Sequence, residues 1–248
     1  MNKIDDLQLY FGHPLCIDER LVVKHPVIGD IIRYGEKRYR RILSALTTTP
    51  SMLISILYDM GIDWEKISDF ELFAFYLRNQ IDDADSAFIF GGLRLNEYNA
   101  VKNDAGELVL RSVISGHEIG AEQYMAIADF LRRIHGLKRV VRKAGNILTK
   151  RRIIEEDRDA RVLAAAEKVD EQSYLLPILS ALINSPGFKY NLEEVQTLPY
   201  YTVTESLKRI SAIRHADALL NGAYCGMSDL SKVPKTDFDW MRDLNKDA

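Results

Sequence analysis

Nine basic side chains lie between Leu131 and Ile154, and no Asp or Glu interrupts them. Guanidinium and ammonium groups at this density can bind phosphates or carboxylates. The flanking segments 59–85 and 155–171 are acidic. Either this basic tract meets an acidic partner, or the protein's own acidic segments neutralise it. The nine residues are Arg132, Arg133, Lys138, Arg139, Arg142, Lys143, Lys150, Arg151 and Arg152.

A nucleic-acid interface is one form of the first interpretation. Proteins of that class usually carry a basic excess, together with aromatic side chains on which bases stack. Here the net charge is -3 at pH 7, and His135 is the one ring within the tract. A run of like charges is more often a solvated face. Nucleic-acid binding through residues 132–152 is therefore kept as the alternative function.

Two groups of residues resemble parts of metal sites. The acidic run 82–85 looks like the start of a calcium loop, but Phe88 stands where that loop requires glycine. His13, Cys16 and His25 provide three potential zinc ligands without a fourth nearby. A solvated acidic helix end explains the first group better, and we expect no metal.

A nucleophile with its base is not apparent. His215 and Cys225 fall on one expected helix, but ten residues separate them by roughly 15 Å. That distance is too great for proton transfer between them, and we expect Cys225 to be a small buried residue. The phosphate-binding patterns G-x-x-x-x-G-K-[ST] and G-x-G-x-x-G are absent from the sequence. The sequence therefore predicts a protein that is not an enzyme and carries no cofactor.

The composition indicates a globular protein. Of 248 residues 47% are hydrophobic and 28% are charged, whereas disorder would require lower hydrophobicity or a larger net charge. Two cysteines are too few for a disulfide framework. The N-terminus lacks the pattern of a signal peptide, and no apolar run reaches the ~20 residues of a membrane span. We expect a soluble, cytoplasmic protein with no membrane partner.

Apolar spacing in the first half predicts helices joined by short β-structure. Leu15–Lys24 is rich in β-branched residues and is expected to form two short strands around Asp18 and Glu19. Alternation and turn residues predict a β-hairpin with strands Tyr98–Lys102 and Glu107–Ile114. Helical periodicity occupies 27–46, 51–60, 70–80 and 121–135.

The second half is expected to be helical throughout. Thr149–Val169 is polar nearly all round, whereas Ser173–Asn184 is apolar on almost every side and is expected at the centre of a core. A long helix should start at Thr202 or Thr204 and end near Cys225. These patterns predict a mainly α protein with a small N-terminal β-ribbon and a central β-hairpin, divided into lobes 1–136 and 137–248.

The last expected helix, Thr236–Leu244, carries Phe238, Trp240, Met241 and Leu244 close to the chain end. Terminal segments fray unless they are held, so these side chains must pack somewhere. They either fold back on the protein's own helices or form an aromatic anchor for a partner's groove. We count them, with the basic tract, as candidate interface residues.

Several phrases resemble uncharacterised proteins of tailed phages and prophages of Gram-positive bacteria. In the second half these are SYLLPILSALINSPGFKYN (173–191), ALLNGAYCGM (218–227) and FDWMRDL (238–244). YFGHPLCIDERLVVKHPVIGDIIRYGEKRY (10–39) and YDMGIDWEKISDFELF (58–73) are similar to the same proteins. The resemblance spans most of the chain and points to the tail-assembly genes, where tail assembly chaperones are encoded beside the tape-measure protein.

The resemblance implies a mostly helical protein that acts by protein–protein contact and not by catalysis. A chaperone of this class coats an extended helical client until the tail tube assembles around it. A structural tail component fits the same residues. The implied partners are the tape-measure or tail-tube protein, with self-association as a further expectation.

Overall fold

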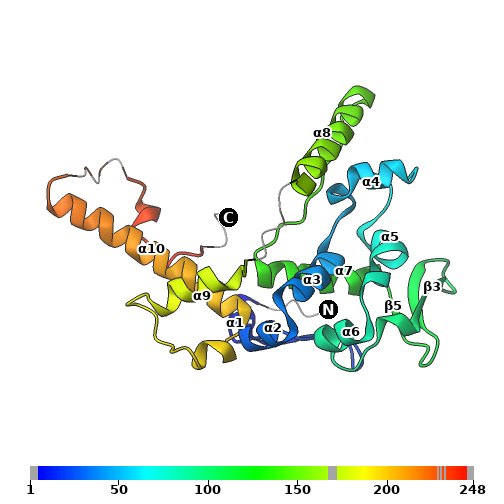
Figure 1. Cartoon of the computed structure of the whole chain (residues 1–248), viewed down its shortest axis with the longest axis horizontal. Helices are drawn as coiled ribbons and strands as arrows, with labels where there is room; N and C mark the ends of the chain where they lie inside the picture. Colours follow the sequence, from blue (N-terminus) through cyan, green and yellow to red (C-terminus); the bar gives the residue numbers. More distant parts are fainter. Residues whose placement is uncertain (1–4, 167–171, 228, 230, 232, 245–248) are drawn as a thin grey trace. The chain divides into compact units, whose positions relative to one another are not determined.

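The computed structural model describes residues 5–166, 172–227, 229, 231 and 233–244. Within these residues it has ten α-helices, one two-stranded antiparallel sheet and one three-stranded antiparallel sheet (Figure 1). Helix makes up 57% of the structure. The predicted mainly α fold with small β elements is therefore confirmed.

The chain forms two compact units that are interleaved in sequence. Unit 1 comprises residues 1–5, 13–25 and 34–172, and unit 2 comprises residues 6–12, 26–33 and 173–248. The division in the second half thus falls after Gln172, whereas the sequence suggested 136/137. The reason is that residues 137–166 are held by side chains of the first half, as described below.

Unit 1 begins with the β-ribbon that the sequence predicts. Strands β1 (Leu15–Cys16) and β2 (Val22–Val23) pair antiparallel. The carboxylate of Asp18 shapes their turn, because its Oδ1 accepts the backbone N–H groups of Arg20 and Leu21, each at 2.8 Å.

Helices form the body of unit 1. They are α3 (Glu36–Thr47), α4 (Ile54–Asp59), α5 (Asp69–Leu72), α6 (Asp83–Phe90), α7 (Ala121–His135) and α8 (Ile147–Ala166). Helix α3 packs against α7. At their contact Tyr124 is fully buried, stacks on Phe73 with ring centroids 4.7 Å apart, and donates its hydroxyl to the carbonyl of Leu46 at 3.2 Å. Burial of such aromatic rings is a main source of stability in a core.

The central hairpin forms as predicted and gains a third strand. Strands β3 (Tyr98–Lys102) and β4 (Leu108–Ser112) pair antiparallel, and β5 (Glu118–Ile119) adds to β4. Gly106 closes the hairpin at φ +81°, a conformation that glycine adopts without strain. Because β5 has two residues, its sequence shows no alternation that could have predicted it.

Unit 2 is assembled from short N-terminal helices and the last part of the chain. Its helices are α1 (Asp6–Tyr10), α2 (Ile28–Tyr34, of which Ile28–Arg33 lie in this unit), α9 (Leu175–Ile183) and α10 (Tyr200–Tyr224). Helix α10 starts after Pro199, and not at Thr202 or Thr204 as predicted. Pro at a helix start is favoured by its fixed φ, and the hydroxyl of Thr202 donates instead to the carbonyl of Tyr10.

Helix α9 corrects the expectation of a fully buried core helix. Only Leu175 and Leu182 of its residues are buried, and Leu176 is 66% exposed. Helix α9 has nine residues and its main helical neighbour is α10, so one face is covered while the rest of its apolar surface faces outward. Unit 2 therefore presents apolar helix surface to solvent.

Candidate interaction surfaces

The basic tract falls into three structural parts. Its first residues end α7, where Gly136 terminates the helix at φ +62°. Residues 136–146 then form an extended segment, here called the strap. The remaining residues begin α8, and Asn146 caps that helix because its side-chain oxygen accepts the N–H of Thr149 at 2.8 Å.

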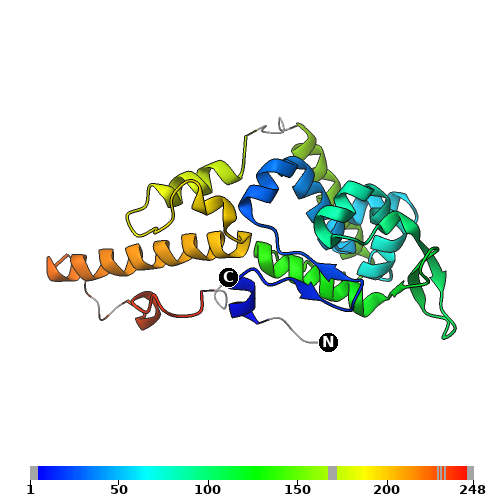
Figure 2. The same cartoon turned by 90° about the horizontal axis from the view of Figure 1, so that it is seen from below.

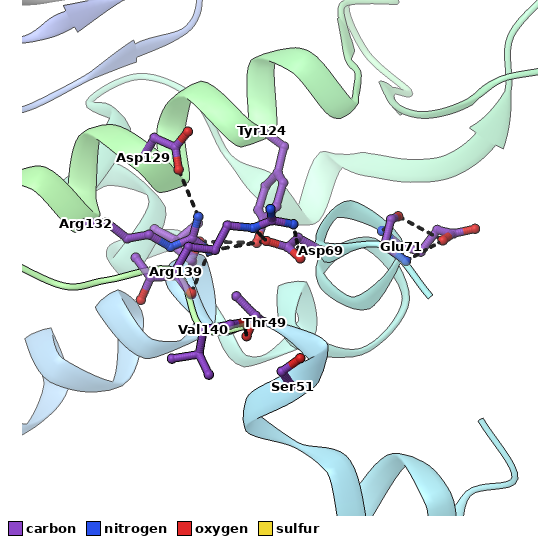
Figure 3. Close-up of polar contacts among 12 residues, drawn as sticks. Thr49, Ser51, Asp69, Glu71, Tyr124, Asp129, Arg132, Arg139 and Val140 are labelled. Carbon is purple, nitrogen blue, oxygen red and sulfur yellow. Dashed lines mark hydrogen bonds and ion pairs between the residues drawn. The ribbon is translucent and has the colours of Figure 1, made fainter. Parts of the chain in front are cut away.

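Two arginines of the tract meet one buried aspartate (Figure 3). Arg139 donates to both carboxylate oxygens of Asp69, at 2.9 and 3.1 Å. Arg132, which is 3% exposed, donates to the carbonyl of Thr47 at 2.8 Å and lies 3.4 Å from the same carboxylate. Its other terminal nitrogen reaches Asp129 at 3.0 Å. These contacts hold α7, α5 and the end of α3 together.

The strap is fixed to unit 1 through its backbone. The hydroxyl of Thr49 donates to the carbonyl of Val140 at 2.8 Å, and the indole N–H of Trp64 donates to the carbonyl of Arg142 at 3.1 Å. The strap also donates one hydrogen bond, from the backbone N–H of Arg142 to Ser51 Oγ at 2.9 Å. Arg139 is the one basic residue of the strap whose side chain is bound to unit 1 in the described structure, and Lys138, Arg142 and Lys143 are exposed.

Helix α8 is held mainly by polar contacts. Ile154 is its one buried residue among those described. Lys150 pairs with Asp63 at 2.6 Å and Glu65 at 3.0 Å, and its ammonium lies 4.6 Å from the centre of the Trp64 ring. Arg158 pairs with Asp59 at 2.6 Å. These acidic partners come from the acidic segment 59–85, as the second interpretation of the tract anticipated.

Asp157 of α8 also supplies the N-terminal cap of α4. Its Oδ2 accepts the backbone N–H of Ser55 at 2.9 Å and the hydroxyl at 2.6 Å. Burial alone would raise the pKa of Asp157, but these bonds and the guanidinium of Arg161 lower it overall. The carboxylate is therefore kept ionised where the free N–H groups of α4 favour a negative charge.

We expect Asp157→Ala to lower the free energy of unfolding of unit 1 by about 1–2 kcal/mol, the usual effect of losing a helix cap. Hydrogen exchange of α8 should also accelerate, because the helix loses one of its few attachments. The matched control is Asp159→Ala, an exposed carboxylate on the same helix for which the described residues provide no partner. Equal effects of the two variants would contradict the capping role.

The structure thus divides the candidate residues of the tract. Arg132, Arg139 and Lys150 are engaged by acidic side chains, and Arg152 pairs with Glu156 one turn along α8 at 2.8 Å. Arg133 is partly buried at the end of α7. Exposed cations without a hydrogen bond or ion pair to the described residues remain at four positions, namely Lys138, Arg142, Lys143 and Arg151.

The candidate residues near the C-terminus do not form the predicted helix. Among the described residues, this region has the single 3-10 turn η7 (Lys235–Asp237), and the segment runs beside α10 (Figure 2). Arg209 of α10 holds it by donating to the carbonyls of Trp240 and Arg242. Phe238 and Leu244 are partly buried, whereas Trp240 is 41% and Met241 73% exposed. The segment therefore folds back on α10 but leaves two large apolar side chains facing solvent.

A groove in unit 2 was not anticipated from the sequence. It has a volume of about 530 Å³ and lies between residues 187–190 and one face of α10. Its apolar lining includes Phe188, Tyr190, Ile210 and Ile213. Lys189 also lines the groove, is exposed, and forms no ion pair with the described residues. The helical periodicity of α10 was visible in the sequence, but the folding of the 185–190 turn against it was not.

The acidic run at 82–85 starts helix α6, as expected, but it is not solvated throughout, because Asp85 is buried. Asp82 and Asp85 form reciprocal hydrogen bonds at the start of α6. Asp85 is fully buried and also accepts from Arg38 at 2.7 Å and Arg41 at 2.9 Å. Burial alone would raise its pKa, but a hydrogen bond from the Tyr34 hydroxyl and those from its other donors lower it overall. In the described part of the chain, no three His, Cys, Asp or Glu residues are grouped to hold a metal ion.

One hydrogen-bonded chain has the residue types of a catalytic relay. Asp18 Oδ2 lies 3.1 Å from His117 Nε2, and His117 Nδ1 lies 2.8 Å from the Tyr98 hydroxyl. Burial, with the nearby charge of Asp18, raises the pKa of Tyr98. A tyrosine whose pKa is raised is a poor nucleophile. These hydrogen bonds instead connect the turn of the β-ribbon to the three-stranded sheet.

Cys225, expected to be buried, is exposed, and so is Cys16.

Comparisons of the chain with protein-family models, with curated proteins and with solved structures find no match. Among the described residues, no helix is both long and apolar enough to cross a bilayer.

Proposed function

We propose that this chain is a non-enzymatic protein of phage tail morphogenesis, which acts in the host cytoplasm by binding other tail proteins. The tape-measure protein is the client that the sequence resemblance favours, and a structural role beside the tail tube uses the same contacts. The observation that carries the proposal is the apolar groove beside α10, in the unit that also contains the exposed apolar surface of α9.

The groove suits a helical client. Its lining includes two aromatic residues and two isoleucines, and an amphipathic helix binds such a groove with apolar side chains spaced three or four residues apart. The positive charge of Lys189 favours a client with a carboxylate beside its apolar stripe. An extended tape-measure helix would offer many such sites in succession.

The proposal is tested by co-expressing the chain with the tape-measure protein of the same genome. We expect the chain to keep that protein in the soluble fraction. Ile213→Asp, which places a charge in the groove, should weaken binding by at least tenfold, since loss of a central interface contact typically costs ~2–4 kcal/mol.

Ala218→Asp is the matched control, because it adds the same charge at an exposed position of the same helix. Melting temperatures of both variants show whether Ile213→Asp remains folded. Full client binding by a folded Ile213→Asp protein, or no effect of the wild-type chain on tape-measure solubility, would contradict the proposal.

Nucleic-acid binding through residues 132–152 is the alternative, and the four exposed cations are the observation that favours it. It predicts a strong salt dependence, with log K falling by up to ~0.9 per phosphate contact for each unit of log salt concentration. An apolar groove predicts a weak dependence. The salt dependence of binding, measured for the protein client and for a DNA duplex, therefore separates the two functions.

A further inference from the structure

Unit 1 contains a pocket that is built from segments far apart in the sequence. Its volume is about 550 Å³, and it lies between the turn of the β-ribbon, the loop 91–94 that follows α6, and the end of the three-stranded sheet where β3 begins. This volume falls within the range of ~300–1,000 Å³ that is usual for small-molecule sites. Every lining residue belongs to unit 1, so the pocket does not depend on the groove of unit 2.

The pocket has an apolar interior. Phe90, Leu93 and Tyr98 line it, and each is at most 6% exposed. The hydroxyl group of Tyr98 is already hydrogen-bonded to His117. The hydroxyl oxygen of Ser112, which also lines the pocket, accepts two backbone N–H groups of the following turn at 3.3 and 3.1 Å. The polar groups left for a ligand are therefore chiefly charged side chains.

Three cations from separate segments line the same pocket. They are Arg20 on the turn of the β-ribbon, Lys24 just after β2, and Arg94 in the loop after α6. All three are exposed, and none of them forms an ion pair within the described part of the chain. The guanidinium groups of Arg20 and Arg94 also lack a hydrogen bond to the described residues. Their donors therefore remain available to a ligand.

The position of Lys24 is set by α6. Its Nζ donates to the carbonyl of Ala87 at 3.3 Å, near the C-terminal end of the helix, where a positive charge is favourable. Its side chain also lies against Gly91, because a Cβ added there would be 3.2 Å from the Lys24 Cε. An ammonium has three N–H groups, so two of those of Lys24 remain for a ligand in the described structure.

The charge of the lining indicates the kind of ligand. Glu19 and Glu97 also line the pocket, and in the described structure neither pairs with a cation, so three basic and two acidic side chains give a net charge of +1. One carboxylate neutralises this lining and can accept two parallel hydrogen bonds from a guanidinium. A polyanion brings excess negative charge against the two glutamates and is repelled.

We propose that this pocket binds a small organic anion that has a single carboxylate and an apolar body. The cations donate to the carboxylate, and the apolar body lies against the buried side chains of the interior. A concave apolar site with a few charged groups is the common form of a small-molecule site. The inference goes beyond the proposed function, since it concerns the other unit and a different class of ligand.

The first test measures binding of 3-phenylpropionate, which has one carboxylate and one apolar ring. In NMR titrations of the isotope-labelled chain, the amides of Gly92 and Leu93 should shift saturably, with a dissociation constant of about 1–10 mM. The uncharged 3-phenylpropionamide should bind at least tenfold more weakly, because it cannot form charge-assisted hydrogen bonds. Equal affinity for the amide, or no saturable shift with the acid, would overturn the proposal.

The second test removes the two guanidinium groups. Arg20→Met combined with Arg94→Met changes the net charge of the lining from +1 to -1 and should abolish saturable binding. Neither side chain has a bond to lose in the described structure, so the melting temperature should stay unchanged. Arg151→Met is the matched control, at an exposed position of α8 without a partner among the described residues. Unchanged affinity in the folded double variant would show that the anion binds elsewhere.

The third test changes the charge of the lining in the opposite direction. Glu97→Gln keeps the shape of the side chain and raises the net charge to +2, so it should strengthen binding of 3-phenylpropionate by about two- to fivefold. Unchanged or weaker binding would contradict the charge argument. Phenyl phosphate, which is mainly a dianion at neutral pH, should bind the wild-type chain more weakly than 3-phenylpropionate. Tighter binding of phenyl phosphate would overturn the choice of a carboxylate.

Discussion

Asp69→Ala is expected to lower the free energy of unfolding of unit 1 by about 3–5 kcal/mol, the usual loss when one member of a buried ion pair is removed. The variant leaves Arg132 buried with its charge only partly compensated, and it leaves Arg139 without its bidentate partner. Urea unfolding followed by the fluorescence of Trp64, which the adjoining strap contacts, measures the change.

Asp129→Ala provides the matched control. Asp129 also pairs with Arg132, at 3.0 Å, but its side chain is 58% exposed. An exposed pair is usually worth no more than ~1 kcal/mol, so this variant should have a small effect. If the two variants destabilised the protein equally, the buried carboxylate would not be the organising element of the cluster.

Replacing both charges separates the ion pair from its packing. In Asp69→Ala combined with Arg132→Met, the buried unpaired charge is gone, so the double variant should be more stable than the sum of the two single effects implies. Arg139, which is 47% exposed, can turn into solvent once Asp69 is absent. Strict additivity of the single effects would show that Asp69 and Arg132 do not act as a pair.

Local features of the fold could be predicted from the sequence because they depend on near neighbours. The Ala121–His135 helix and the strand Tyr98–Lys102 follow from periodicity and turn residues. The exposure of side chains could not be predicted in the same way. The apolar run of α9 looked like core, but burial requires a neighbouring element on every side, and a sequence does not show how many neighbours a helix has.

The candidate sites depend on contacts across long separations in the chain. Sequence analysis found the basic tract and posed the right alternatives, yet it could not pair Arg132 with a carboxylate 63 residues earlier. Similarly, Arg20 and Arg94 look like ordinary surface arginines in the sequence, since no local pattern places them at one pocket. Their common position becomes visible only once the turn of the β-ribbon and the loop after α6 have been placed.

Acidification is expected to destabilise unit 1 well above the range in which carboxylates titrate. His135 ends α7, and its Nε2 lies 2.6 Å from the Tyr39 hydroxyl in a hydrogen bond. Although the residue as a whole is partly exposed, burial of its imidazole, with a contribution from the charge of His25, lowers its pKa from 6.5 to about 3. The folded protein therefore keeps this ring neutral at pH values where the unfolded chain protonates it.

The direction of the effect follows from proton binding. Between pH 6.5 and about 3 the unfolded state binds one more proton than the folded state at His135, so stability falls as pH falls. The slope is about 1.4 kcal/mol per pH unit, which gives a loss of roughly 2–3 kcal/mol between pH 6.5 and 4.5. Above pH 6.5 this residue contributes no pH dependence. The lowered pKa values of Asp85 and Asp157 act in a separate window, because their stabilisation is lost only below their unfolded value of 3.8.

His135→Gln isolates the effect of this ring. Glutamine can keep a hydrogen bond to the Tyr39 hydroxyl but does not titrate. Urea unfolding at half-unit steps from pH 7.5 to 4.5 should show a slope that is about 1.4 kcal/mol per pH unit smaller in the variant than in the wild type below pH 6.5. His215→Gln, at an exposed position of α10, should leave the slope unchanged. Identical slopes for His135→Gln and the wild type would mean that the imidazole is protonated in the folded protein and that α7 ends in a more open environment than its contacts indicate.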